Sequence, residues 1–367
     1  MLVNKKINLN VLPIATPALG VEFYKESIQK SLNFSSKRKE NYKKYLKFKN
    51  SPKTSKLNFL PIRLDIENVS RCNFKCKMCV VRKWHKGKRA EDLSLKNFKK
   101  IIDEFYSLVE IKLQGLGESL MQGDDYFRMI KYAKDKKIWV RTVTNASLLH
   151  LKDNYKKLID TKVDEIQISI DGATKNVFEE IRRQSKFEQI LKNCESINKY
   201  AKNNNRNVTK AWCCLQKDNY HEFFEIIKIC SKIGFNQIVF SLDLHGSGNS
   251  QFYNENLGKS VLNKMNREKL EQAIKFGNKN NIKVEYWSIN EKFNNKNICH
   301  WPFERFYISS DLRIVPCCMI GNPDHFEILS NKIKIAEKWL SKEYEKFRLN
   351  HLKGNIPKCC SGCYEKI

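Results

Sequence analysis

The 367-residue sequence predicts an α/β fold: a partial (β/α)6 barrel of the TIM type, followed by a small cysteine-rich C-terminal domain. Over residues 59–290, short segments of alternating apolar and polar residues are separated by segments with helical spacing of apolar residues. Strands separated by helices form parallel sheets through right-handed crossovers. From residue 291 onward the alternation stops, and six of the thirteen cysteines lie in this last part of the chain.

The elements of the barrel domain, residues 59–290, follow one another in a regular order. Residues 59–68 (FLPIRLDIEN) alternate as a strand does, and 94–108 have helical spacing behind Ser94, a plausible N-cap. Residues 1–58 precede them as a lysine-rich arm with two expected short helices. The other expected strands are 109–119, 138–145, 165–171, 208–215, 236–244 and 282–289. The other expected helices are 126–137, 150–160, 174–203, 220–233 and 265–280.

Residues 291–367 are expected to form a separate small domain. Residues 307–318 (YISSDLRIVPCC) are typical of a short β-hairpin with its turn at 309–311, and 331–354 are typical of a helix that ends at Gly354. The core of so short a segment is thin, so we expect a metal or docking against the barrel to stabilise it.

The net charge of +28, from 68 basic and 40 acidic side chains, has two interpretations. It favours an anionic partner, or it reflects a general bias toward lysine. No basic stretch is interleaved with aromatic residues as a single-strand nucleic-acid surface requires, so nucleic acid is not the expected partner. No run of about 18 apolar residues predicts a membrane span. The N-terminal segment lacks an uninterrupted apolar core, so we expect a cytoplasmic protein without an export signal.

Cysteine spacing is the most informative feature of the sequence. An odd number of cysteines favours metal or cluster ligation over disulfide bonds. Cys72, Cys76 and Cys79 (SRCNFKCKMCVV) lie just after the first expected strand, at the end of a barrel where active sites occur. Three thiolates can hold three irons of a cubane cluster and leave the fourth iron open. The competing interpretation is a zinc site with His85 as the fourth ligand.

The Cys72-x3-Cys76-x2-Cys79 pattern resembles the signature of the radical S-adenosylmethionine (SAM) enzymes. The resemblance covers roughly residues 60–250. It implies a 4Fe-4S cluster whose open iron binds SAM, and reduced flavodoxin or ferredoxin as the electron donor. It also implies reductive cleavage of SAM to methionine and a 5′-deoxyadenosyl radical, which abstracts a hydrogen atom from the substrate.

Further segments resemble the SAM-binding segments of this family. GLGES (115–119) resembles its glycine-glycine-glutamate turn, although Leu116 and Ser119 depart from the usual residues; in the third-strand segment, Ala146 replaces a glycine. The SAM contacts that the resemblance implies are Met78, Gly117, Glu118, Thr144, Asn145, Ser169, Asp171 and Arg182.

The C-terminal cysteines predict a second site. Cys299, Cys317, Cys360 and Cys363 could fully ligate another cluster, since a hairpin and the C-terminal turn would bring them together. This arrangement resembles the single-cluster "twitch" form of the SPASM extension of radical SAM enzymes, which implies an auxiliary 4Fe-4S cluster. Leu312 stands where that hairpin usually has glycine. Cys318 could replace Cys317, Cys359 could replace Cys360, and the same four thiols could instead hold zinc.

These expectations lead to a radical SAM oxidoreductase of the dehydrogenase or epimerase type. The auxiliary cluster would assist oxidation or epimerisation of a sugar, cyclitol or nucleotide-linked substrate, because residues 1–60 are too short for a winged-helix leader-binding domain. The alternatives are a peptide (RiPP) maturase of the SPASM type, an RNA-modifying enzyme, and a non-catalytic zinc protein. No catalytic side chain is assigned; Cys213 or Cys214 could return a hydrogen atom to a substrate radical, or both could simply pack.

Overall fold

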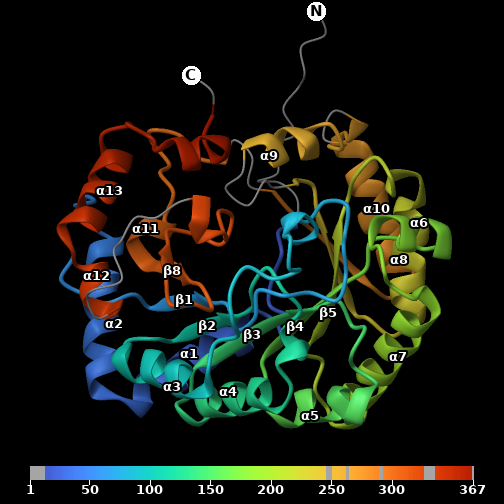
Figure 1. The fold of residues 1–367 in the computed structure, drawn as a ribbon, viewed down its shortest axis with the longest axis horizontal. Helices are drawn as coiled ribbons and strands as arrows, with labels where there is room; N and C mark the ends of the chain where they lie inside the picture. The colour runs from blue at the N-terminus through green and yellow to red at the C-terminus, as the bar shows by residue number, and fades with distance from the viewer. Residues whose placement is uncertain (1–12, 245–249, 262–263, 289–291, 326–334, 366–367) are drawn as a thin grey trace, which may run out of the picture.

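A nine-stranded sheet in the order β7-β6-β5-β4-β3-β2-β1-β8-β9 organises the chain (Figure 1). The computed structural model describes residues 13–244, 250–261, 264–288, 292–325 and 335–365. All pairings from β7 to β8 are parallel, and β8 pairs antiparallel with β9. The strands are β1 Arg63–Ile66, β2 Glu110–Leu113, β3 Trp139–Thr144, β4 Glu165–Ser169, β5 Thr209–Cys214, β6 Gln237–Ser241, β7 Lys283–Trp287, β8 Arg305–Ile308 and β9 Ile314–Val315. The sheet stays open between β7 and β9, which confirms the predicted partial barrel.

The helices surround this sheet, and most match the expected ranges (Figure 1). Ser94 caps the third helix by accepting a hydrogen bond from the Asn97 amide, as predicted. The single helix expected over 174–203 is instead two helices, because the backbone leaves the helical conformation at Arg182. The helices are α1 Val21–Phe34, α2 Ser36–Lys49, α3 Leu95–Glu104, α4 Asp124–Asp135, α5 Asn154–Asp160, α6 Lys175–Ile181, α7 Phe187–Asn203, α8 Phe223–Lys232, α9 Ser250–Leu257, α10 Arg267–Lys279, α11 Trp301–Glu304, α12 Ile335–Trp339 and α13 Lys342–Leu352.

The two faces of the sheet differ in polarity. Leu64 and Ile66 of β1 are fully buried in the main hydrophobic core, which they share with apolar residues of α3 and α4. Successive side chains of a strand point to opposite faces, so Arg63, Asp65 and Glu67 lie on the inner face. The inner face of the barrel therefore carries charged residues.

The C-terminal segment extends the barrel sheet. β8 pairs in parallel with β1, in a register that places Phe306 beside Leu64. Trp339 of α12 packs in the same hydrophobic core, and its indole N–H donates to the carbonyl of Phe59 over 2.8 Å. Docking of this kind was one of the two ways in which we expected the thin core of this segment to be stabilised. Within the described residues, the helix expected over 331–354 appears as α12 and α13.

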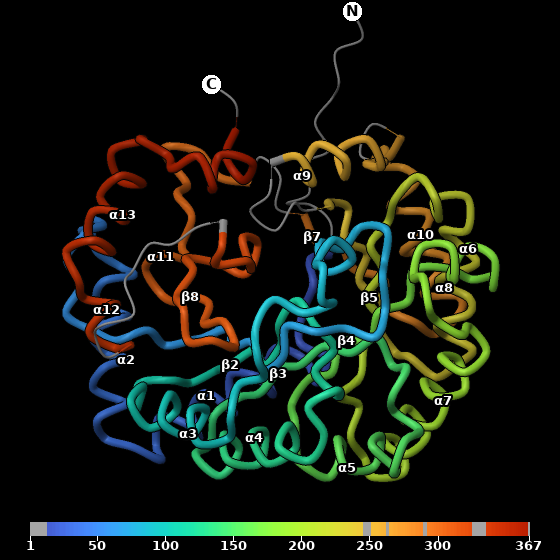
Figure 2. Tube along the Cα trace, viewed as in Figure 1, coloured from blue at the N-terminus to red at the C-terminus, as the bar shows by residue number. Residues whose placement is uncertain are grey.

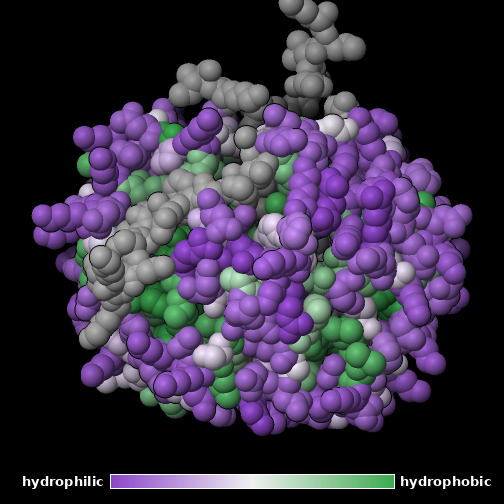
Figure 3. All heavy atoms as spheres, viewed as in Figure 1, coloured by the Kyte–Doolittle hydropathy of each residue, from purple (hydrophilic) through white to green (hydrophobic). Residues whose placement is uncertain are grey.

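The N-terminal arm closes the end of the barrel at which the strands begin. The Thr16 hydroxyl donates to Glu285 over 2.6 Å, and the Tyr24 hydroxyl donates to Glu110 over 2.5 Å. Glu110 starts β2, so these contacts lie opposite the strand ends where barrel active sites occur. The face shown in Figure 3 is largely hydrophilic. No helix within the described ranges is both long and apolar enough to cross a membrane.

Candidate functional site

The loop after β1 carries Cys72, Cys76 and Cys79. It is held from two sides. The backbone N–H groups of Lys75 and Lys77 donate to carbonyls just after α6 and at its C-terminal end, over 3.0 and 2.9 Å. The Asn256 amide of α9 donates to the carbonyl of Met78 over 3.2 Å. Figure 2 shows this light-blue loop crossing in front of the strands, below α9. Residues far apart in the sequence therefore fix the shape of the loop.

Of the three thiols of this loop, Cys76 is buried and Cys72 and Cys79 are half-buried. Burial raises the pKa of Cys72 and Cys79, and raises that of Cys76 to about 12. The Arg182 guanidinium opposes this rise at Cys76 and Cys79, so its positive charge faces the site. As they stand, no three His, Cys, Asp or Glu side chains in the described part of the chain are arranged to hold a metal ion. The donor set fits a cluster in chemistry, since thiolates are the usual ligands of iron–sulfur clusters.

The glycines of the turn after β2 are required by close backbone approach. A Cβ at Gly117 would lie 2.2 Å from the carbonyl oxygen of Arg71, and one at Gly115 would lie 2.2 Å from Cγ of Glu67. The next residue, Glu118, donates its N–H to Arg71 over 2.9 Å. The turn is therefore packed directly against the start of the cysteine loop.

Glu118 is a buried carboxylate beside the cysteine loop. It accepts hydrogen bonds from the Thr144 hydroxyl over 2.6 Å and from the Asn145 N–H over 2.7 Å. Burial raises the pKa of Glu118, and the hydrogen bonds from Thr144 and Asn145 oppose that rise. Its charge also raises the pKa of Cys72. These three predicted SAM contacts therefore lie together at the ends of β2 and β3.

Asn145 connects the third strand to the cysteine loop. Its side-chain amide donates to Asn73 over 3.0 Å and lies 3.9 Å from the Cys72 sulfur. Ala146 follows with a φ of 64°, in the left-handed region that favours glycine. Alanine therefore replaces the family's glycine at a position whose backbone conformation favours glycine.

Asp171 and Arg182 form a buried pair at the end of β4, with an Nη2–Oδ2 distance of 2.7 Å. Asp171 also accepts the N–H of Cys214 over 2.7 Å. Cys214 is half-buried on the inner face, close enough to Cys76 for their charges to interact, whereas Cys213 is fully buried in the core. Ser169, at the end of β4, is half-buried. Of the two adjacent cysteines, Cys214 is the one that faces the barrel interior.

The tail cysteines lie near one another. Cys299, Cys317 and Cys360 are close enough that charge on one raises the pKa of the next, and Cys363 interacts in the same way with Cys360. Burial raises the pKa of Cys299 to about 12 and that of Cys363 to about 11. A bridge between Phe293 and Tyr364 joins the two segments that carry these thiols.

The two alternative ligands in the hairpin lie close together. Cys318 contacts Asp65 on the inner face of the barrel, but it also lies near Cys317 and Cys363 and raises the pKa of both, so position does not decide between Cys317 and Cys318. The sulfur of Cys359 is 3.7 Å from that of Cys360, so position does not decide which of these two cysteines is the ligand. Leu312 has a φ of 66°, the conformation expected where the related hairpin has glycine.

Several polar residues of the inner face were not predicted from the sequence as site residues. Glu67 and Arg89 form a buried ion pair beside the cysteine loop. Lys112 of β2 is half-buried next to Asp65 in the sheet register, and it makes no hydrogen bond or ion pair with the residues described. The signal that could have revealed Glu67 is the alternation in RLDIE, which places a charge at every second position of β1.

Comparison with known proteins identifies one domain of this chain. Residues 68–230 match the model of the radical SAM superfamily. The chain is 26% identical over 208 residues to GTP 3',8-cyclase of Aliarcobacter butzleri, covering 54% of this chain and 61% of that protein. It is 29% identical over 139 residues to the mycofactocin maturase MftC of Mycobacterium tuberculosis, covering 37% and 34%. The match thus spans less than two thirds of each of these relatives.

Solved structures share the fold beyond the matched domain. Streptococcus suis SuiB bound to the precursor peptide SuiA aligns with a TM-score of 0.61 at 14% identity, covering 84% of this chain and 70% of that one. The structure of anSMEcpe with bound AdoMet aligns with a TM-score of 0.57 at 16% identity, covering 84% and 92%. Members of the matched family use a 4Fe-4S cluster and SAM. Residues 68–230 of the chain therefore form a radical SAM domain.

Proposed function

We propose that this chain cleaves SAM reductively and abstracts a hydrogen atom from a substrate bound on the inner face of the barrel. The observation that carries the proposal is the convergence of the cysteine loop, the Glu118 carboxylate and the Arg182 guanidinium at the ends of β1–β4. When bound, a 4Fe-4S cluster with SAM supplies the electron and the 5′-deoxyadenosyl radical for this chemistry.

The residues of this site would bind the cluster and the charged groups of SAM through complementary charges. Cys72, Cys76 and Cys79 would hold the cluster as thiolates. Glu118, with the backbone of Gly117, would orient the amino group of SAM, because a buried carboxylate favours a cationic partner. Arg182, which is already paired with Asp171, would attract the carboxylate of SAM. Met78, Thr144, Asn145 and Ser169 would line the same site.

The tail would supply a second redox centre. Cys299, Cys317, Cys360 and Cys363 would hold an auxiliary cluster able to accept the electron that a substrate radical loses on oxidation. The mutual proximity of these thiols supports this role, as does the fold shared with SuiB and anSMEcpe over 84% of the chain. Oxidation is therefore the favoured outcome, with epimerisation as the alternative. Reduced flavodoxin or ferredoxin is the proposed electron donor.

A peptide is the substrate class that the comparisons support best. One aligned structure is SuiB with a precursor peptide, another is anSMEcpe with a peptide, and one relative is a mycofactocin maturase. The sugar or cyclitol substrate expected from the sequence finds no such support. A nucleotide-linked substrate remains the second candidate, because Lys112, whose charge acts on Asp65 but which forms no ion pair within the described residues, offers a cation to an anionic group, and one relative is a GTP cyclase. In contrast, Arg63, Arg141, Lys210 and Arg305, the other cations of the inner strands, are all ion-paired.

The experiment that tests this function compares anaerobically reconstituted wild type with the Cys72→Ala/Cys76→Ala/Cys79→Ala variant. We expect about eight irons per chain in wild type and about four in the variant, with 5′-deoxyadenosine formed from SAM only by wild type. The matched control is Cys194→Ala, which removes a thiol buried in the core and should leave both readouts unchanged. Wild type that binds iron but never cleaves SAM under reducing conditions would refute the proposed function. A variant without iron would refute the auxiliary cluster.

A further inference from the structure

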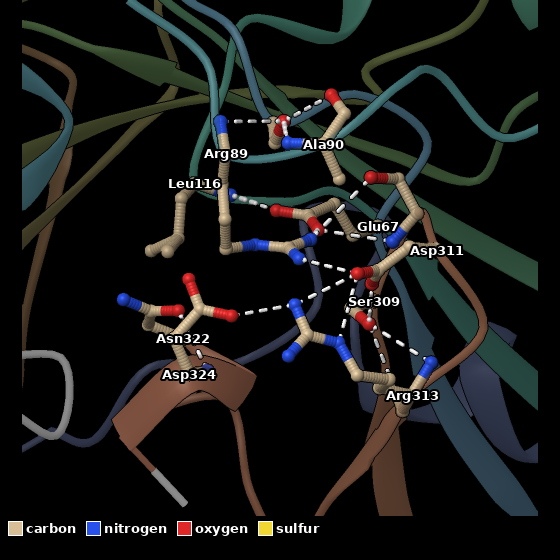
Figure 4. Close-up of polar contacts among 11 residues, drawn as sticks. Glu67, Arg89, Ala90, Leu116, Ser309, Asp311, Arg313, Asn322 and Asp324 are labelled. Atoms are coloured by element: carbon tan, nitrogen blue, oxygen red, sulfur yellow. Dashed lines mark hydrogen bonds and ion pairs between the residues drawn. The ribbon is translucent and has the colours of Figure 1, made fainter. Parts of the chain in front are cut away.

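Glu67 joins three loops that are distant in the sequence (Figure 4). It follows β1, and its side chain is fully buried. One carboxylate oxygen accepts the N–H of Leu116, in the turn after β2, over 3.2 Å. The other accepts the N–H of Ser310, in the C-terminal hairpin, over 3.0 Å, and pairs with Arg89 of the cysteine loop at 2.5 Å. Both oxygens are thus engaged, each with a different part of the site.

Arg89 extends this junction toward the hairpin. The Arg89 side chain is only 2% exposed. Its guanidinium makes a second ion pair, with Asp311, at 3.0 Å. Asp311 in turn pairs with Arg313 at 2.7 Å, and Arg313 pairs with Asp324 at 2.6 Å (Figure 4). A buried ion pair is costly to desolvate, so it is weak evidence for stability alone. In this chain, the Glu67–Arg89–Asp311 network links the segment after β1 to the hairpin.

An apolar contact connects the same two segments independently. A Cβ placed on Gly321, just after the tail cysteines Cys317 and Cys318, would lie 3.1 Å from a methyl carbon of Leu116. The Leu116 side chain is therefore packed against the C-terminal segment, while its backbone N–H is bound by Glu67. Leu116 directly precedes Gly117 and Glu118, which the proposed function assigns to SAM.

We propose that Glu67, together with Arg89, is a positioning residue that holds the SAM-binding turn in register with the auxiliary hairpin. The inference rests on the proposed function of the turn. Thr144 and Asn145 fix one end of this turn through Glu118, and Glu67 fixes the other through Leu116. The geometry of the auxiliary hairpin is thereby transmitted to the SAM site.

The Glu67→Gln variant tests this role. An amide presents one oxygen and one N–H2 group, so it cannot accept from Leu116 on one side and from Arg89 and Ser310 on the other. We expect the dissociation constant of SAM, measured anaerobically by equilibrium dialysis on the reconstituted protein, to rise about 10-fold, within the usual range for coupled sites. We also expect the change that SAM causes in the EPR spectrum of the reduced cluster to weaken.

Glu285→Gln is the matched control. Glu285 is an equally buried, ion-paired carboxylate, and it lies beneath the barrel against the N-terminal arm. Both variants should lower the unfolding midpoint, but only Glu67→Gln should weaken SAM binding. Equal SAM affinity in Glu67→Gln and wild type would overturn the inference and leave Glu67 as a purely structural group.

Asp311→Asn provides a milder perturbation, should Glu67→Gln fail to take up iron. It leaves the Glu67–Arg89 pair in place and alters only the hairpin end of the network. A rise of about 2- to 5-fold in the SAM dissociation constant is expected, and no rise would overturn the inference. If wild type itself does not bind SAM, the proposed function fails instead, so the two failures are distinguishable.

Discussion

The Glu110→Gln substitution tests how the barrel is closed beneath its site. Glu110 begins β2 on the inner face, with its side chain only 7% exposed. It pairs with Arg63 at 3.1 Å and with Arg141 at 2.9 Å, and it accepts the hydrogen bond of Tyr24 from the N-terminal arm. The amide of glutamine would leave both guanidinium groups with a neutral neighbour.

The expected loss of unfolding free energy in Glu110→Gln follows from the pKa of Glu110. Burial by itself would raise this pKa, but Arg141 and Arg63 bring it down to about 2, below the ordinary 4.5. A difference of about 2.5 in pKa is worth about 3 kcal/mol of unfolding free energy. The loss of one partner from a buried ion pair costs about 3–5 kcal/mol, which agrees. Because the folded pKa is the lower one, the contribution is complete above pH 4.5 and is lost as pH falls toward 2.

Urea unfolding of the reduced, metal-free chain measures this effect. We expect Glu110→Gln to lose about 3 kcal/mol near pH 7, and the difference from wild type to shrink in acid. The control is Glu22→Gln, whose partner Lys25 is exposed and whose loss should cost less than about 1 kcal/mol. If Glu110→Gln costs no more than Glu22→Gln, the ion pairs at the closed end of the barrel do not stabilise the fold as reasoned here.

Leu312→Gly should be about 1 kcal/mol more stable to urea than Leu312→Ala, because a Cβ is strained at a φ of 66°; equal midpoints would contradict this. Since burial raises the pKa of Cys76 to about 12, ligation must release its proton, so iron uptake should be weaker near pH 6.5 than near pH 8.5. Uptake that is independent of pH, measured as iron per chain, would count against this reasoning. In the tail, Cys360→Ser should lose the auxiliary iron and Cys359→Ser should retain it; the opposite result would exchange the two assignments.

Local patterns were enough to predict the fold class and the radical SAM domain. The strands and helices have periodic apolar residues that report burial directly, and Ser94 caps α3 as its chemistry predicts. The three cysteines of the loop occupy one short segment, so their spacing is visible in the sequence and predicts a cluster with one open iron. Ala146 and Leu312, which depart from glycine in the sequence, both have positive φ in the structure.

Contacts between distant segments were decided only by the tertiary structure. Nothing in the residues around Phe306 indicates that β8 joins β1, because both strands carry the same alternation and could pair with any neighbour. In the same way, Glu67 and Arg89 are ordinary charged residues in the sequence, and only folding brings them to Ser310. Periodicity and motif spacing are local properties that a sequence displays, whereas the burial of a charge against its partner depends on chain segments more than 200 residues apart, as for Glu67 and Ser310, separated by 243.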